Sequence, residues 1–176
     1  FGGKAEAWAI EDGKLISKGE GGGWLGTEKD YADFELSFQF KLSPESNSGI
    51  YLRGSSGTVV EDSRIDGIPG LDPGEKGSGI HLWNSHGFRL ERNAIRDVRD
   101  GFYVQSSAGG VIRGNRVSDI RYGLHYMFSD DNVFEDNVFE NGDAGTAIMY
   151  SKRIRFERNR FLHNRGYADR TVMLDI

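Results

Sequence analysis

The fold is decided by residues 79–164, which read GIHLWNSHGFRLERNAIRDVRD (79–100), GFYVQSSAGGVIRGNRVSDIRY (101–122), GLHYMFSDDNVFEDNVFENGDA (123–144) and GTAIMYSKRIRFERNRFLHN (145–164). In these four segments, residues of one kind recur every 22 positions. The clearest columns contain glycine, serine or asparagine: Gly79, Gly101, Gly123 and Gly145; Ser85, Ser107, Ser129 and Ser151; and Asn93, Asn115, Asn137 and Asn159. A spacing that is kept through four segments indicates a repeat protein.

The apolar residues identify the type of repeat. In the first segment they form three short clusters, which are Ile80 with Leu82, Leu90, and Ile95 with Val98. Three short strands with polar corners are typical of one coil of a parallel β-helix, and the 3.6-residue period of a helical solenoid is absent. Successive coils lie about 4.8 Å apart, so each column becomes a line of similar side chains. We therefore predict an all-β fold, a right-handed parallel β-helix of about five 22-residue coils.

The repeat extends toward the N-terminus through one insertion. Gly49 lies 30 residues before Gly79, which is one 22-residue repeat plus 8. Proline and glycine residues place the extra residues in a surface loop within 67–76. We predict that the β-helix occupies residues 47–176 and that Gly49 begins its first coil.

Residues 1–46 have the pattern of short antiparallel strands. The stretch from Trp8 to Ile10 and the pair Leu15-Ile16 flank an Asp-Gly dipeptide, which is a strong hairpin signal. From Phe34 to Leu42, apolar and polar residues alternate, which predicts a strand with one buried face. We expect a short antiparallel β segment before the β-helix.

The composition excludes several functional classes. The 176 residues include 22 basic and 27 acidic side chains, and this net charge of -5 argues against a nucleic-acid partner. Cysteine is absent, so no disulfide or thiolate metal site is expected. No apolar run reaches the roughly 18 residues of a transmembrane segment. Phe1-Gly2-Gly3 is not a signal peptide, so we expect either a cytoplasmic protein or a sequence that begins after a removed signal.

The asparagine and serine columns fit structural roles. A corner asparagine tolerates a left-handed backbone, and stacked amides hydrogen-bond from coil to coil. No histidine or lysine recurs beside the serine column to act as a base. We therefore expect no nucleophilic chemistry at these serines.

Outward-facing columns are the candidates for function. One contains His81, Tyr103, His125 and Ala147, and the next contains Trp83, Gln105, Met127 and Met149. Imidazole and thioether groups suit copper(I), so His125, Met127 and Met149 form a candidate metal site. His81 lies two coils from His125, roughly 9.6 Å by strand spacing, which is too far to share one ion.

Two other interpretations of these columns stay open. His81, Trp83, Tyr103 and Gln105 form a candidate ligand surface, on which aromatic rings would stack against sugars, with Tyr126 or Phe128 beside them. The structural interpretation is that aromatic and methionine side chains only cover the sheet.

Asp97 and Asp119 are weak catalytic candidates. They share a column with a spacing of about 4.8 Å, and a retaining glycosidase uses carboxyl groups about 5–5.5 Å apart. However, Arg99 and Arg121 follow two residues later, and arginine pairing lowers carboxyl pKa values. A salt-bridged surface therefore fits better than a catalytic pair. We expect a non-enzymatic protein; if it is an enzyme, glycan hydrolysis or lyase chemistry would be its class.

Motifs within residues 49–167 resemble the NosD family. They are Gly77-Ser-Gly-Ile-His-Leu-Trp-Asn-Ser-His86, Arg99-Asp-Gly-Phe-Tyr-Val104, Arg121-Tyr-Gly-Leu-His-Tyr-Met-Phe-Ser129, Asp131-Asn-Val133, Ile148-Met-Tyr-Ser-Lys152 and Asn164-Arg-Gly-Tyr167. The family consists of periplasmic right-handed β-helix proteins with carbohydrate-binding and sugar-hydrolase repeats. The resemblance implies a periplasmic or secreted accessory that works with ABC transporter components in maturing the copper site of nitrous oxide reductase. Copper is the only cofactor it implies.

Residues 1–53 resemble the start of a different family, the 3-keto-disaccharide hydrolase domain, which is a concanavalin-like β-sandwich. The resemblance rests on Trp8, Glu11-Asp-Gly13, Gly22-Gly-Trp-Leu25, Thr27, Tyr31, Asp33-Phe-Glu-Leu36 and Asn47-Ser-Gly-Ile-Tyr-Leu-Arg53. It implies a glycan as an alternative partner. Residues 47–53 fit both resemblances, which suggests a chimera. A chimeric fragment without a function of its own is the remaining alternative.

Overall fold

The computed structural model describes residues 5–18, 29, 34–41, 49–165 and 172–175. The chain divides into two compact units, residues 1–40 and 41–176. The domain boundary predicted between residues 46 and 47 lies outside the described residues.

The first unit contains the hairpin that the Asp-Gly pair predicts. A short 3-10 turn, η1 (Ala5–Ala7), leads into β1 (Trp8–Glu11), which pairs antiparallel with β2 (Lys14–Ser17). The register joins Glu11 to Lys14, so only two residues form the turn, and both have positive φ angles, 49° at Asp12 and 70° at Gly13. This turn geometry matches the twist of the flanking strands.

The strand predicted from Phe34 to Leu42 is wrong for the part that is described. Residues 34–41 form no β-ladder, and their apolar side chains are exposed, including Phe34 at 71% and Leu36 at 68%. Alternation specifies which face of a strand would be buried, but a strand also needs a neighbour that pairs with its backbone N–H and C=O groups. Among the described residues this segment has no such neighbour.

The second unit is the predicted parallel β-solenoid, built from three sheets. The first sheet contains β3 (Ile50–Arg53), β6 (Ile80–Trp83), β9 (Asp100–Gln105), β12 (Tyr122–Met127), β15 (Ala144–Met149) and β18 (Val172–Asp175). The second contains β4 (Val59–Glu61), β7 (Arg89–Glu91), β10 (Val111–Arg113), β13 (Val133–Glu135) and β16 (Arg155–Glu157). The third contains β5 (Arg64–Asp66), β8 (Ala94–Arg96), β11 (Arg116–Ser118), β14 (Val138–Glu140) and β17 (Arg160–Leu162).

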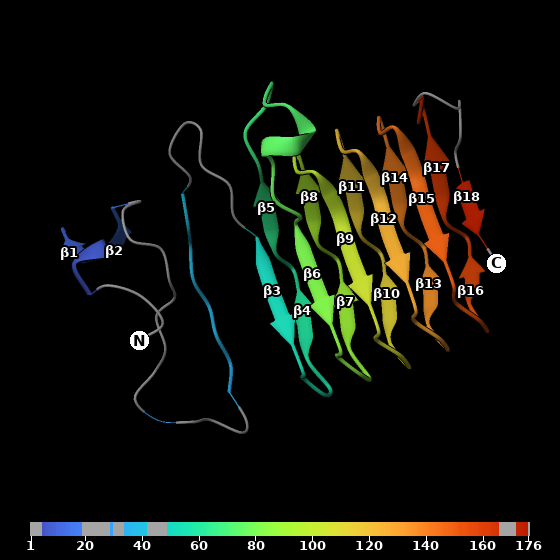
Figure 1. Cartoon of the computed structure of the whole chain (residues 1–176), viewed down its shortest axis with the longest axis horizontal. Helices are drawn as coiled ribbons and strands as arrows, with labels where there is room; N and C mark the ends of the chain where they lie inside the picture. The colour runs from blue at the N-terminus through green and yellow to red at the C-terminus, as the bar shows by residue number, and fades with distance from the viewer. Residues whose placement is uncertain (1–4, 19–28, 30–33, 42–48, 166–171, 176) are drawn as a thin grey trace. The chain divides into compact units, whose positions relative to one another are not determined.

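Each coil takes one strand from each sheet, and every neighbouring pair of strands in these sheets is parallel. Within the described residues there are five complete coils, and β18 adds one strand of a sixth. The coils follow one another in chain order along the solenoid (Figure 1). The fold class predicted from the 22-residue spacing is confirmed.

The insertion between the first and second coils also lies where it was predicted. Ile50 pairs with Ile80 and Ile65 with Ile95, so the first coil keeps the register of the others across the longer interval. The added residues include a 3-10 turn, η2 (Pro73–Glu75), whose start is capped by the side chain of Asp72, which accepts a hydrogen bond from the Gly74 N–H at 3.2 Å. The extra residues therefore form a local turn and leave the ladder intact.

The inward columns form one continuous core. Fully buried side chains include Ile80, Phe102 and Leu124 in the first sheet, and Leu90 and Phe134 in the second. Glycine recurs every 22 residues because the backbone there lies close to the next coil. A Cβ atom at Gly79 would lie 2.6 Å from Cγ2 of Ile95 and 2.8 Å from the carbonyl oxygen of Gly101.

The asparagine column forms the coil-to-coil ladder expected of stacked amides. The backbone N–H and the Nδ2 group of Asn115 both donate to Oδ1 of Asn137, at 3.0 and 2.9 Å, and its Nδ2 group also donates to the Leu90 carbonyl at 2.8 Å. The left-handed residue at this corner is the one before the asparagine, for example Asp136 with a φ of 55°. The expectation that asparagine itself is left-handed is therefore wrong.

The serine column forms a second ladder. The N–H of Ser107 donates to Oγ of Ser129 at 3.0 Å, and Oγ of Ser107 donates to the Gln105 carbonyl at 2.8 Å. Ser85, Ser107 and Ser129 are fully buried. With their hydroxyls used in this way, these serines stabilise the corner.

Candidate functional site

The two outward columns predicted from the sequence do line up on the first sheet. His81 pairs with Tyr103, Tyr103 with His125, and His125 with Ala147. Two residues further along each strand, Trp83, Gln105, Met127 and Met149 are paired in the same order. We call the surface formed by these two columns the histidine face.

Aromatic and imidazole rings stack along the first column. The ring centroids of His81 and Tyr103 are 4.4 Å apart, and those of Tyr103 and His125 are 4.6 Å apart. Tyr51 extends the stack by one coil, 5.3 Å from His81. Burial and the nearby Arg99 guanidinium lower the pKa of His81, against an opposing effect of Asp100. The imidazole of His81 is therefore neutral at pH 7.

A buried carboxylate that sequence reasoning missed lies beside this stack. The side chain of Asp100 is fully buried, and its Oδ2 atom is 3.2 Å from Nδ1 of His125. Arg121 binds the same carboxylate in a bidentate manner, from Nε to Oδ1 at 2.9 Å and from a terminal nitrogen to Oδ2 at 2.7 Å. Burial alone would raise the pKa of Asp100, but the hydrogen bonds from His125 and Arg121 outweigh it and lower this pKa.

The expected pairing of Asp97 and Asp119 with the following arginines is wrong. Arg121 binds Asp100, and Nε of Arg99 also lies 3.5 Å from Oδ2 of Asp100. Asp97 and Asp119 occupy a left-handed corner, with φ angles of 57° and 56°, and Asp97 has Arg96 at 4.0 Å. A side chain at a corner leaves at a different angle from one in the middle of a strand, so counting two residues along did not identify the partners. A catalytic role for this pair stays an untested prediction.

The thioethers of the candidate metal site lie on adjacent strands. Met127 pairs with Met149, and His125 precedes Met127 by two residues on the same face of β12. The Tyr103 hydroxyl lies 3.9 Å from the sulfur of Met127, so this thioether is turned toward the aromatic stack. No group of three or more histidine, cysteine, aspartate or glutamate residues suitable for a metal occurs in the described part of the chain. A site on this face would therefore depend on sulfur donors.

The candidate sugar-stacking residues are only partly brought together. Trp83 is 37% exposed, but the Arg53 guanidinium lies over one face of its indole ring, 4.1 Å from the centroid. Tyr126 cannot contribute, because it is fully buried and its hydroxyl is bonded to the Ser129 carbonyl and Asn132. Phe128 is exposed and stacks on Tyr150, with centroids 5.0 Å apart.

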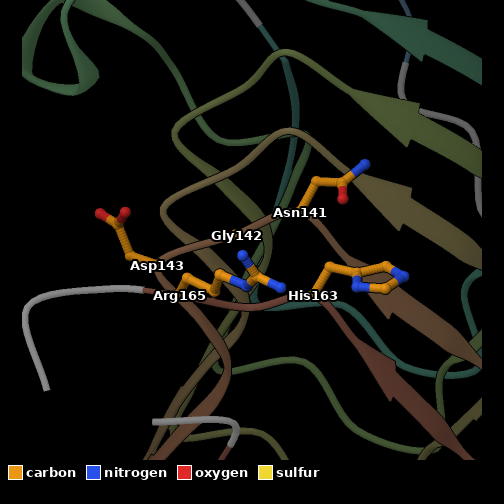
Figure 2. A pocket seen from close by; sticks show the side chains of 5 residues that line it. All are labelled: Asn141, Gly142, Asp143, His163 and Arg165. Atoms are coloured by element: carbon orange, nitrogen blue, oxygen red, sulfur yellow. The ribbon is translucent and has the colours of Figure 1, made fainter. Parts of the chain in front are cut away.

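A separate, open pocket lies at a corner of the fourth and fifth coils. It is lined by Asn141, Gly142, Asp143, His163 and Arg165, none of which was a candidate from sequence (Figure 2). The side chain of Asp143 points away from those of Asn141 and His163 in this view. Asp143 therefore does not share a binding point with Asn141 and His163.

Comparison with known proteins assigns the solenoid. The family model described as "Periplasmic copper-binding protein (NosD)" matches residues 69–174, which is more than half of the chain. The chain belongs to the NosD family. A curated NosD family relative, "Probable ABC transporter binding protein NosD" from Stutzerimonas stutzeri, is 36% identical over 53 residues. This match covers 30% of the chain but only 12% of the relative.

A second family model, described as "3-keto-alpha-glucoside-1,2-lyase-like domain", matches residues 1–88, and through this half the chain belongs to that family as well. The match overlaps the NosD match and includes residues that form the first coil of the solenoid. No solved structure matches the chain. Among the described residues, no helix is long and apolar enough to span a membrane.

Proposed function

We propose that this protein is a non-enzymatic periplasmic accessory that handles copper(I) for the copper site of nitrous oxide reductase. The observation that carries the proposal is the placement of one imidazole and two thioethers together on the histidine face, in a chain of the NosD family. ABC transporter components are proposed partners, in line with the name of the curated relative, and nitrous oxide reductase is a proposed partner because of the family resemblance.

The chemistry of the donor set fits copper(I). Thioether and imidazole ligands are soft or borderline, and they select copper(I) over the hard cations that prefer oxygen. Methionine has three rotatable bonds, so Met127 and Met149 can adjust around an ion. His125 would be the third ligand. An ion held by two neutral thioethers on an outer face is accessible to a partner, as transfer of cargo requires.

The proposal is tested by titrating the purified protein with copper(I) in competition with a colorimetric chelator. Leucine is similar in volume to methionine but has no sulfur donor, so a Met127→Leu/Met149→Leu variant should bind copper(I) about tenfold more weakly or worse. The control is Gln105→Leu, one coil away in the same column, which should keep its affinity. Unchanged affinity in the double variant would remove the proposed site.

A second candidate function is glycan binding, favoured by the match of residues 1–88 and by the exposed indole of Trp83. Aromatic rings on a sheet surface stack against the apolar faces of sugars. Oligosaccharides would then change the tryptophan fluorescence, and Trp83→Ala would abolish the change. A response that persists in this variant would have to come from another of the three tryptophans.

A further inference from the structure

We infer that Asp100 is a positioning residue, which holds His125 in the tautomer whose Nε2 lone pair faces outward for a metal ion. The inference rests on the proposed function, because it deepens the description of the same site. It concerns a residue of the motif Arg99-Asp-Gly-Phe-Tyr-Val104 that was not a candidate site residue from the sequence. It is carried by the contacts around the Asp100 carboxylate.

The hydrogen bond between Asp100 and His125 carries its proton on one of two atoms. The two atoms, Oδ2 and Nδ1, are 3.2 Å apart. Arg121 binds both oxygens of the carboxylate, and an ionised carboxylate only accepts hydrogen bonds. Nδ1 must therefore be the donor, since two lone pairs at this distance would repel each other.

A terminal nitrogen of Arg121 also lies near Nδ1 of His125, at 3.4 Å, and this contact could suggest the opposite tautomer. The same nitrogen is 2.7 Å from Oδ2 of Asp100, so its hydrogen is directed to the carboxylate. The guanidinium is further held over the Tyr122 ring, 4.5 Å from the centroid. Arg121 thus fixes the carboxylate, and the carboxylate fixes the imidazole.

The other ring nitrogen of His125 is Nε2. With the proton on Nδ1, Nε2 carries the lone pair, and it lies on the opposite side of the ring from Asp100. In the described part of the chain Nε2 has no hydrogen-bond partner. Ring contacts from Tyr103, at 4.6 Å, and Tyr122, at 5.4 Å, hold the imidazole plane edge-on. This is the arrangement in which a carboxylate orients a metal-binding histidine.

The tautomer can be measured in the metal-free protein by long-range ¹⁵N–¹H correlation NMR, above the ordinary histidine pKa. The chain has only four histidines, and His125→Gln assigns the relevant signals. His125 should show a proton on Nδ1. His86 is an internal reference for the opposite tautomer, with its proton on Nε2, because its Nδ1 accepts a hydrogen bond from the Ala108 N–H at 3.2 Å.

The Asp100→Asn variant tests causation. Its amide can donate to Nδ1, so the proton of His125 should move to Nε2, and the affinity for copper(I) should fall about 10- to 100-fold. Asp136→Asn is the matched control, since this carboxylate pairs with Arg158 on an exposed surface; both the tautomer and the affinity should stay as in the wild type. A purely structural role for Asp100 would lower the melting temperature without moving the tautomer.

Three results would overturn the inference: a proton on Nε2 of His125 in the wild type, an unchanged tautomer in Asp100→Asn, or wild-type copper(I) affinity in that variant. If Asp100→Asn does not fold, the wild-type tautomer still decides. If the wild-type protein does not bind copper(I), the proposed function fails, whereas the tautomer measurement, made without metal, still reports whether Asp100 positions His125.

Discussion

Two outward surfaces of the same solenoid differ in how their charged side chains are buried and paired. On the second sheet and the corner after it, exposed arginines pair with carboxylates from coil to coil, for example Arg113 with Glu135 at 2.8 Å and Arg158 with Asp136 at 2.7 Å. We call this surface the charged face. Beside the histidine face, the carboxylate of Asp100 is fully buried and binds both Arg121 and His125. Ion pairs thus recur from coil to coil on the charged face, whereas the Asp100 cluster occurs only at particular coils.

The largest expected difference between the two surfaces is in the loss of unfolding free energy when one arginine is removed. Arg121→Leu leaves the buried Asp100 carboxylate without its bidentate partner and should lower the free energy of unfolding by about 2–4 kcal/mol. Arg113→Leu removes a half-exposed guanidinium, and Glu135 keeps Arg155 as a second partner at 3.5 Å, so the change should cost less than about 1 kcal/mol. Urea unfolding of both variants measures the two costs. Equal costs would mean that the two surfaces do not differ as described.

A smaller difference is expected in the response to mild acid. The folded-state pKa of His81 lies below its ordinary value of 6.5, so the unfolded chain binds more protons once the pH falls below 6.5. The titration of His81 therefore does not lower the free energy of unfolding above pH 6.5. It lowers this free energy as the pH falls through 6.5 toward the folded-state pKa. His81→Gln should reduce this loss. Urea midpoints measured against pH provide the test, and an identical slope in the variant would contradict it.

The charged face should respond only at lower pH. The pKa values of Asp62 and Asp136 are lowered below 3.8 by hydrogen bonds from Arg92 and Arg158, respectively. Such carboxylates lose their contribution to the free energy of unfolding only as the pH falls below 3.8 toward their folded-state pKa. Of His81, Asp62 and Asp136, only His81 therefore responds in mild acid.

The smallest expected effect is in the salt dependence of the two arginine substitutions. Concentrated salt screens exposed charges and acts much less on buried ones. The cost of Arg113→Leu should vanish in about 1 M sodium chloride, whereas most of the cost of Arg121→Leu should remain. Parallel urea titrations at two ionic strengths measure this, and a loss of both costs in salt would show that Asp100 is effectively solvated.

The fold could be predicted because a solenoid converts spacing into contact. One repeat is one coil, so residues 22 positions apart become neighbours, and Met127 and Met149 had to pair once the fold was recognised. The same rule shows why Tyr126 was a poor choice for a sugar surface. It lies between two outward residues and pairs with the inward residues Val104 and Ile148.

The features that could not be predicted depend on the direction of a side chain or on the presence of a neighbouring strand. Asp100 stands in a column with Tyr122 and Ala144, so no repetition marks it. Its contact with His125 runs diagonally between coils and follows from the reach of both side chains. The NosD-like motif Arg99-Asp-Gly-Phe-Tyr-Val104, which contains Asp100, is a sequence signal that could have indicated it. Residues 34–41 show the reverse case, a clear alternation without a strand to pair with.

We propose that the histidine face binds copper(I) through sulfur and imidazole. X-ray absorption spectroscopy at the copper edge of the copper(I)-loaded protein identifies the ligand atoms and so tests this proposal. The spectrum should contain scattering from two sulfur atoms and one imidazole, and the sulfur signal should disappear in Met127→Leu/Met149→Leu. A wild-type spectrum with only nitrogen and oxygen neighbours would contradict the claim, because the three methionines are the only sulfur-containing residues of the chain.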